Sequence, residues 1–310
     1  MSIAVRITSL CTEPEFFLQQ HSHLSQVVSA TPSLSVNSNQ TSEVFSPIHH
    51  SQEASGPGYQ MVQVCAHYEG SIQELRKELN QQVKNTATLS VHVVQEELYT
   101  SAKKLIVLDV DSTLIREEVI DELARHAGKA EHVQYITERA MNGHLVFEES
   151  LKERVKALAG VSVEAIEQVT HQLTLSPGVL RLIDSLHSKG HKIAAVSGGF
   201  IQILRPLSQR IGLDNAQANT LEIVHETLTG KVVGEVVTPE TKRLYLQKWA
   251  AEENVSLSHV VAIGDGANDI LMLEEAALGI AFCAKPSLQL ASDVQLNFLR
   301  LDAVQHFMGL

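Results

Sequence analysis

LIVLDVDSTL, residues 105–114, is the most informative stretch of this 310-residue chain. The aliphatic run predicts a buried strand, which gives way abruptly to acidic and hydroxyl side chains. An ionised carboxylate is costly to bury unless it is paired or binds a metal, so packing does not account for Asp109 and Asp111. We therefore expect both carboxylates to take part in chemistry.

Strands and helices alternate through the rest of the chain beyond this stretch. Strands are predicted at 105–109, 193–196, 216–221, around 232–237, 260–263 and 279–282. Helices are predicted at 119–127, 147–158, from Ser176-Pro177 to Gly190, 200–211, 239–251 and 268–276. This alternation favours an α/β fold with a doubly wound parallel sheet covered on both faces. Ligands of such sheets bind at the carboxyl ends of the strands.

Polar residues follow three of the predicted strands and are therefore expected at one edge of the sheet. They are Asp109 and Asp111, Ser197 and Gly198, and Asp265, Asn268 and Asp269, with Lys242 near the start of a helix. Carboxylate oxygens suit Mg²⁺, which keeps several waters for substrate phosphate. Backbone amides at a glycine-rich turn can bind phosphate, and a lysine can neutralise a transferring phosphoryl group. Together the set indicates phosphoryl transfer to an aspartate.

The first 100 residues differ in composition, because they contain no aspartate and are rich in Ser, Gln, Thr, Asn and His. We expect a small α+β domain at 1–100 and the catalytic domain at 101–310. The pattern predicts the order βαββαβ, with elements at 2–8, 13–28, 34–36 with 42–45, 61–67, 71–84 and 88–95. Ser71 and Glu74 form a capping-box pattern, and Ile72, Leu75 and Leu79 give that helix an apolar face. Residues 31–58 could equally be a loop.

Composition excludes several classes of protein. A formal net charge of -12 argues against a nucleic-acid or anionic-membrane partner. Three separated cysteines form neither a disulfide framework nor a metal-ligand spacing. We find no secretory signal and no apolar run long enough to span a membrane, and therefore expect a cytoplasmic protein. It could form a homo-oligomer, but no pattern indicates its oligomeric state.

Four ordered motifs resemble those of the haloacid dehalogenase superfamily: DVDST at 109–113, SGG at 197–199, Lys242 and GDGAND at 264–269. EEVIDELA after the first motif, RAMNGHLVFEESLKERV at 139–155 and AN at 218–219 are similar to the phosphoserine phosphatases of that superfamily. The resemblance covers residues 104–298. Phosphoserine phosphatases often carry N-terminal ACT-like regulatory modules, which share the order predicted for residues 1–100.

The resemblance implies Mg²⁺-dependent hydrolysis of O-phosphoserine, the last step of L-serine biosynthesis. Asp109 would be the nucleophile, and Asp111 would protonate the leaving serine and then activate water. The metal would bind the side chains of Asp109 and Asp265 and the backbone carbonyl of Asp111. The remaining implied roles are phosphate binding by Ser197, Gly198, Lys242 and Asn268, and orientation of Lys242 or a metal-bound water by Asp269.

The long segment between Leu114 and Ala195 predicts a helical cap at about 116–175. By resemblance, Glu118 would meet the substrate amino group and Arg154 its carboxylate, while Met141 and Phe147 would close the pocket. A zwitterion needs one anion and one fork-shaped cation, which agrees with this pair. Taken alone, Glu118 and Arg154 would be surface charges, and Met141 and Phe147 would be cap core residues.

Three alternatives stay open at this point. The same site could pass phosphate to another hydroxyl compound, as a phosphoserine:homoserine phosphotransferase would. It could act on another small phosphomonoester. The chain could also be an amino-acid-sensing protein whose phosphatase half is idle, although the intact set of Asp109, Asp111, Lys242 and Asp265 argues against this.

Overall fold

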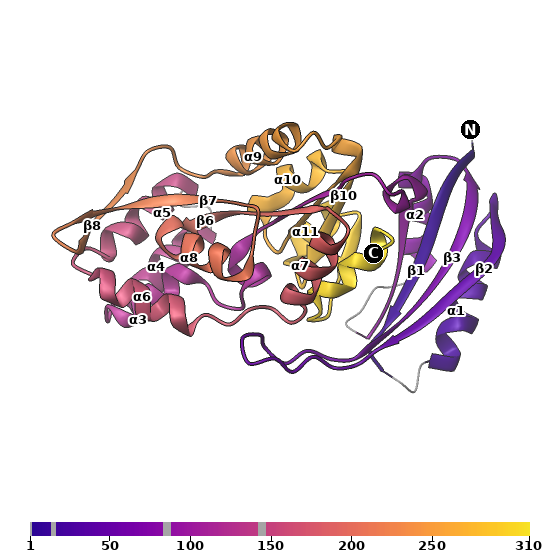
Figure 1. Cartoon of the computed structure of the whole chain (residues 1–310), viewed down its shortest axis with the longest axis horizontal. Coiled ribbons are helices and arrows are strands. Elements are labelled where there is room, and N and C mark those ends of the chain that lie inside the picture. The colour runs from indigo at the N-terminus through magenta and orange to yellow at the C-terminus, as the bar shows by residue number, and fades with distance from the viewer. Residues whose placement is uncertain (1, 14–16, 83–87, 142–146) are drawn as a thin grey trace.

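The computed structural model describes residues 2–13, 17–82, 88–141 and 147–310, and these form two units, each built on its own sheet (Figure 1). The smaller sheet has four strands in the order β2-β3-β1-β4, and the larger has seven in the order β11-β10-β9-β5-β6-β7-β8. This arrangement confirms the predicted fold class, an α/β unit preceded by a small α+β unit.

The N-terminal unit is an antiparallel sheet with two helices. Its elements are β1 (Ser2–Cys11), α1 (Phe17–Ala30), β2 (Leu34–Phe45), β3 (Tyr59–Glu69), α2 (Ile72–Gln82) and β4 (Leu89–Gln95). The two short strands predicted near 34–36 and 42–45 are one strand, β2, with a register shift between Val36 and Gln40. The capping box is present, since Ser71 N donates to Glu74 Oε2 and Glu74 N donates to Ser71 Oγ.

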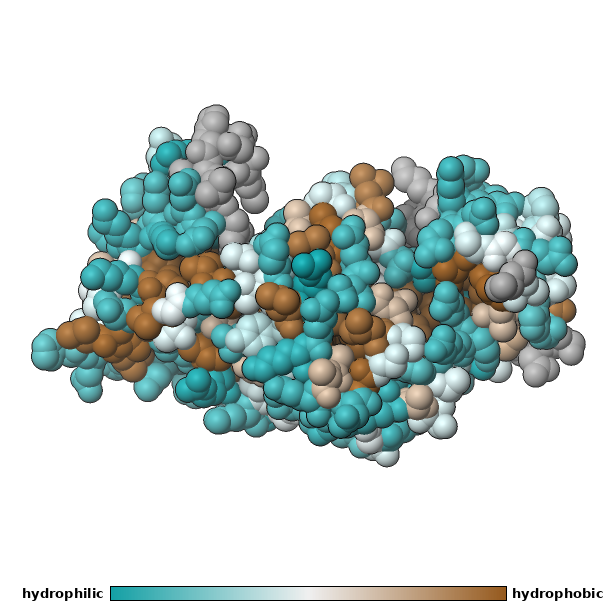
Figure 2. Space-filling model, turned by 90° about the horizontal axis from the view of Figure 1, so that it is seen from above, coloured by the Kyte–Doolittle hydropathy of each residue, from teal (hydrophilic) through white to brown (hydrophobic). Residues whose placement is uncertain are grey.

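The larger sheet is parallel except at one edge. Its strands are β5 (Leu105–Leu108), β6 (Lys192–Phe200), β7 (Asn215–Val224), β8 (Thr227–Val233), β9 (Val260–Gly264), β10 (Leu278–Phe282) and β11 (Val294–Leu296). The strand expected around 232–237 is β8, which lies earlier in the chain and pairs antiparallel with β7. A β-hairpin needs only a short turn, so no crossover helix separates these two strands. Figure 2 shows hydrophobic residues gathered at the end of the molecule formed by this hairpin.

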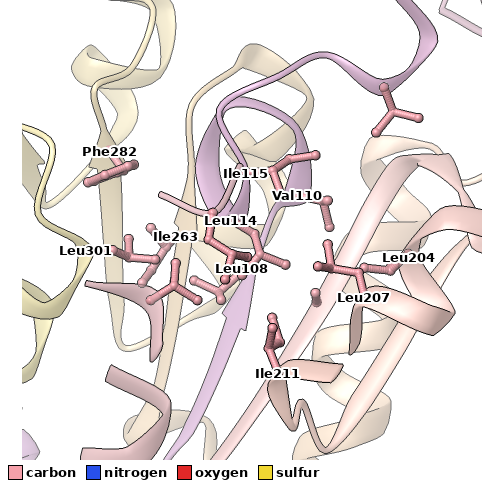
Figure 3. Packing of buried hydrophobic residues seen from close by; sticks show 14 of the residues in the cluster. Leu108, Val110, Leu114, Ile115, Leu204, Leu207, Ile211, Ile263, Phe282 and Leu301 are labelled. Atoms are coloured by element: carbon pink, nitrogen blue, oxygen red, sulfur yellow. The ribbon is translucent and has the colours of Figure 1, made fainter. Parts of the chain in front are cut away.

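Helices cover both faces of this sheet. They are α7 (Val179–Ser188), α8 (Ile201–Ile211), α9 (Pro239–Glu252), α10 (Ile270–Glu275) and α11 (Pro286–Ala291). Successive residues of β5 point to opposite faces: Ile106 and Leu108 belong to one buried cluster, and Leu105 and Val107 belong to the other. Figure 3 shows Leu108 of this cluster with Ile263 and Leu301 on one side of it and Leu204 and Leu207 of α8 on the other. The sheet is thus buried on both sides.

The cap is a set of four helices inserted between β5 and β6: α3 (Val119–His126), α4 (Ala130–Met141), α5 (Phe147–Ala157) and α6 (Val163–Gln172). The predicted helices at 119–127 and 147–158 correspond to α3 and α5, whereas α4 and α6 were not predicted. The sequence does carry a start signal for α6, namely a serine at the N-cap position. The Oγ of this residue, Ser162, accepts a hydrogen bond from Ala165 N at 3.2 Å.

Several predicted element boundaries were wrong by a few residues. Helix α7 begins at Val179 rather than at Pro177, because Gly178 precedes it in the left-handed region at φ 90°. The strand expected to end at Val196 continues as β6 to Phe200, with a register shift after Ser197. The helix expected at 268–276 begins as a 3₁₀ turn over Ala267–Asp269 and becomes α-helical at Ile270.

The two units pack through aromatic and buried polar side chains. Phe45 and Tyr59 stack with ring centroids 4.7 Å apart, and Tyr59 Oη lies 2.8 Å from His306 Nε2. His92 of β4 meets the ring of Phe307 edge-on.

None of the helices in the described ranges is long and apolar enough to cross a membrane.

Candidate active site

Three neighbouring strands, β9, β5 and β6, bring the predicted polar residues to one edge of the sheet. A pocket of about 810 Å³ lies there, between this edge and the cap. Of the predicted residues, those that line it are Asp109, Asp111, Glu118, Arg154, Gly198, Asp265 and Asn268. The order of the strands therefore assembles residues that are distant in the sequence.

Lys242 joins two buried carboxylates beneath the pocket. Its Nζ donates to Asp109 Oδ1 and to Asp269 Oδ1, each at 2.6 Å. Burial alone would lower the pKa of Lys242, but the two carboxylates raise it above its usual value. Burial and the neighbouring Asp269 raise the pKa of Asp109, and the Lys242 ammonium opposes this rise. The lysine is therefore held charged at the carboxylate of Asp109.

Asp269 uses both of its carboxylate oxygens. Oδ1 accepts from Lys242, and Oδ2 accepts from the amides of Asp265 and Gly266, each at 3.2 Å. Its side chain is fully buried. Because both oxygens already have partners, Asp269 is suited to orienting Lys242 and the Asp265 backbone rather than to binding a ligand directly.

Asp111 is held by the cap side and by β6. Its Oδ1 accepts from Val119 N at 2.8 Å, and its Oδ2 accepts from Ser197 Oγ at 3.1 Å. Burial, followed by the charge of Glu118, raises the pKa of Asp111 to about 7. Glycine at position 199 allows the main chain to approach this carboxylate closely, because a Cβ there would lie 2.9 Å from Asp111 Oδ2. A carboxyl group with this pKa can both give and take a proton near neutral pH.

One carboxylate oxygen from each of Asp109, Asp265 and Asp269 lies within 4.8 Å of the other two. Since both oxygens of Asp269 already accept hydrogen bonds, Asp109 and Asp265 are the two suited to hold a cation. Burial, followed by the charge of Asp269, raises the pKa of Asp265 to about 6. Such crowding of carboxylates is unfavourable without a positive charge between them. Hard oxygen donors of this kind suit a divalent cation such as Mg²⁺.

The cap side contributes two acids, Glu118 and Asp121, and the guanidinium of Arg154 to the pocket. Glu118 Oε1 accepts from Ser112 Oγ at 3.0 Å, and Arg154 Nε donates to Ser150 O at 3.3 Å. Burial lowers the pKa of Arg154, and the charges of Asp121 and Glu118 oppose this. The side chains of Met141 and Phe147, which were expected to close the pocket, lie outside the described part of the chain.

Several residues that shape the site were not predicted as site residues. Asn219 is fully buried, and its Nδ2 donates to Gly198 O at 2.8 Å while its Oδ1 accepts from Val237 N. It therefore fixes the main chain at Gly198. Lys285 lines the pocket, and its Nζ lies 3.7 Å from Asp265 Oδ2. It follows β10, the strand beside β9, so the same strand-end rule could have found it. Asp121 also lines the pocket.

Comparison with known proteins agrees with this geometry. Residues 103–277 match the sequence model of the haloacid dehalogenase-like hydrolases. The chain is 46% identical over 222 residues to a phosphoserine phosphatase of Streptomyces coelicolor, covering 72% of this chain and 54% of that protein. It is also 46% identical over 198 residues to a phosphoserine phosphatase of Streptococcus thermophilus, covering 64% of this chain and 92% of that protein. The chain thus spans about half the length of the first relative and most of the second.

Two solved structures are similar to the fold. A phospho-aspartyl intermediate analogue of phosphoserine phosphatase has a TM-score of 0.63 and 42% identity, covering 66% of this chain and 99% of that one. A haloacid dehalogenase family hydrolase from Salmonella enterica serovar Typhi has a TM-score of 0.78 and 27% identity, covering 98% of both chains. The second structure therefore matches both units together.

Proposed function

The chain belongs to the haloacid dehalogenase-like hydrolases and, within them, to the phosphoserine phosphatase family, and we propose that it hydrolyses O-phosphoserine to serine and phosphate. The observation that carries this proposal is the buried contact of Lys242 with Asp109, beside Asp111 and Asp265 in one pocket. A carboxylate that contacts an ammonium group at the carboxyl end of a parallel sheet is suited to attack phosphorus. Cytoplasmic location stays a prediction from the sequence.

Asp109 and Asp111 divide the chemistry between them. An oxygen of Asp109 attacks phosphorus, the bond from phosphorus to the serine oxygen breaks, and Asp111 gives its proton to that oxygen. Asp111 then takes a proton from water, the water oxygen attacks phosphorus, and the bond to Asp109 breaks to release phosphate. The similar structure described as a phospho-aspartyl intermediate analogue supports this two-step scheme. Lys242 offsets negative charge throughout.

Mg²⁺ is the proposed cofactor. The side chains of Asp109 and Asp265 would hold it, with the backbone carbonyl of Asp111, while Asp269 orients Lys242 and the Asp265 backbone. When bound, the ion offsets charge on the phosphoryl oxygens and on the crowded carboxylates. Ser197, the amide of Gly198 and Asn268 would bind phosphate oxygens, and Ser197 Oγ would exchange its bond to Asp111 for one to substrate.

Substrate choice is assigned to the cap. Glu118 would bind the amino group of phosphoserine, and the Arg154 guanidinium would bind its carboxylate with two parallel hydrogen bonds. Both line the same pocket as the catalytic carboxylates. Met141 and Phe147 would close the pocket over the substrate. Lys285, at the open rim, would attract the anionic substrate and offset the charge of Asp265.

Phosphate release from a panel of phosphomonoesters, with and without Mg²⁺, tests the proposal. O-phosphoserine should be hydrolysed far faster than the other compounds, and only with Mg²⁺. A flat profile would favour a general phosphomonoesterase. Suppression of phosphate release by added homoserine would favour the phosphotransferase alternative. Absence of hydrolysis with every compound would favour an amino-acid-sensing protein with an idle phosphatase half.

A further inference from the structure

Residues 46–58, which connect β2 to β3, form an extended segment that we call the hinge arm. Figure 1 shows it leaving the N-terminal sheet and reaching beneath the larger unit. Its two sides pair near the base through an isolated antiparallel bridge, in which Ile48 N donates to Gly56 O and Gly56 N donates to Ile48 O. Through this segment the N-terminal unit contacts the larger unit at a distance from its own sheet.

The cap is joined to the sheet by two chain segments that pair with each other. Ile115 and Leu175 form an antiparallel bridge between them, and both side chains are fully buried. Ser176 N donates to Leu114 O at 3.0 Å on the same side. Any rotation of the cap against the sheet must bend the chain at this pair, which is therefore the cap hinge.

The hinge arm adds a third strand to the cap hinge. Leu175 N donates to Gln52 O at 3.1 Å, and Ala54 N donates to Leu175 O at 2.8 Å. Glu53 and Leu175 thus form a parallel bridge. Both main-chain hydrogen bonds of Leu175 go to the arm, so its backbone cannot turn without breaking contacts with the N-terminal unit.

The side chain of Glu53 strengthens this contact. Its carboxylate accepts from Leu180 N at 2.8 Å and from Gly178 N at 3.2 Å, at the first turn of α7. The residue is only 8% exposed. Hydrogen bonds from amides to a charged acceptor are stronger than those between neutral groups. The tip of the arm is therefore tied to the chain on the sheet side of the hinge.

The base of the arm is fixed to the larger unit as well. Arg300 Nη1 donates to Ser46 O and to Pro57 O, each at 2.6 Å. The guanidinium is fully buried and paired with Asp302. The arm, which is part of the N-terminal unit, is therefore held to the larger unit at its base and at its tip, and it fixes the position of Leu175.

We propose that the hinge arm is a positioning element for catalysis, through which the N-terminal unit sets the orientation of the cap. The proposal rests on the proposed function, in which Glu118 and Arg154 of the cap bind substrate. A loosened hinge would let the cap turn these two residues away from the phosphate site. Apparent affinity then falls with the fraction of molecules that are competent to bind, whereas the chemical step at saturation is unchanged.

Glu53→Gln tests the proposal, because it keeps the side-chain size but removes the charge and one acceptor oxygen. In the full-length protein with Mg²⁺, KM for O-phosphoserine should rise about fivefold or more, the lower end of coupling between distant sites, with kcat within about twofold. Amide exchange over residues 173–178 should become faster. A purely structural role would lower Tm without changing KM.

Arg76→Gln is the matched control, because Arg76 pairs with Asp293 across the two units but does not touch the hinge. It should leave KM and the exchange of residues 173–178 unchanged. If Glu53→Gln does not fold, Ala54→Pro removes the amide that donates to Leu175 O and should give the same rise in KM. Unchanged KM and exchange in the folded variant would overturn the proposal. Exchange needs no substrate, so it also separates this failure from a wild-type protein that does not hydrolyse O-phosphoserine.

Discussion

Replacing Asp269 by asparagine probes the buried charge network from which the proposed mechanism starts. Asparagine has the same shape but carries one acceptor oxygen and one donor NH₂. Asp269 accepts from Lys242 with one oxygen and from the amides of Asp265 and Gly266 with the other. In one orientation of the asparagine the NH₂ faces the ammonium, and in the other it faces two amide donors. Neither orientation satisfies the site.

The cost follows from the bonds that are lost. A hydrogen bond to a charged group contributes about 1.5–3 kcal/mol, and Lys242 keeps its bond to Asp109, so we expect Asp269→Asn to lower the free energy of unfolding by about 2–3 kcal/mol. For a unit of this size that corresponds to a Tm lower by about 5–10 °C. Because Lys242 loses one of two anchors, kcat should also fall by about 10²-fold, as expected for a misplaced catalytic group.

Thermal melts with Mg²⁺, which offsets the repulsion among the carboxylates that Asp269→Asn would otherwise relieve, measure the first effect, and phosphate release with Mg²⁺ measures the second. Asp184→Asn is the control, since Asp184 is exposed on α7 and should change stability by no more than about 0.5 kcal/mol. A Tm within about 1 °C of wild type, together with an unchanged kcat, would refute the claim that Asp269 holds Lys242 in place.

Three further predictions concern the cap, the rim and the interface between the units. Arg154→Lys should raise KM for O-phosphoserine about tenfold with a smaller change in kcat, because an ammonium cannot form the two parallel bonds of a guanidinium; an unchanged KM would remove Arg154 from substrate binding. Lys285→Gln should lower kcat/KM at low ionic strength, and the difference from wild type should shrink as salt is added, since attraction between exposed charges is screened; a loss independent of salt would contradict a steering role. Burial, followed by Arg181 and Arg300, lowers the pKa of His306 to about 4, below its unfolded value of about 6.5. The stabilisation from this group is therefore fully present above pH 6.5, and the free energy of unfolding should fall by roughly 2–3 kcal/mol by pH 4.5 from this group alone. Urea unfolding of His306→Asn should show a smaller loss between pH 7 and pH 4.5 than wild type, and an equal loss would assign the acid sensitivity to other groups.

Much of the catalytic edge could be predicted from the sequence because strand ends are local features. Asp109 and Asp265 each follow a short apolar run, and parallel strands direct their carboxyl ends to one side. The rule that ligands bind at this edge then predicts which residues meet. The same rule was not applied to the strand at Leu278–Phe282, and Lys285 was missed for that reason.

Other features depend on contacts that no short pattern carries. Among the described side chains of helix α4, Val133 and Ile136 are the buried ones, and so sparse an apolar pattern does not predict a helix. The hinge arm pairs with Leu175 through the main chain of Gln52 and Ala54, and this pairing leaves no signature in residue type. Asn219 acts through a hydrogen bond to Gly198 across neighbouring strands, and only the strand register reveals this contact.

Trapping of the phosphorylated protein tests the role of Asp109 most directly. Wild-type protein mixed with Mg²⁺ and phosphate-labelled O-phosphoserine, then quenched in acid during turnover, should carry label on the peptide that contains residues 105–114, at Asp109. Asp109→Asn should carry no label and release no phosphate. Label on a different residue, or hydrolysis by Asp109→Asn at the wild-type rate, would contradict nucleophilic attack by Asp109.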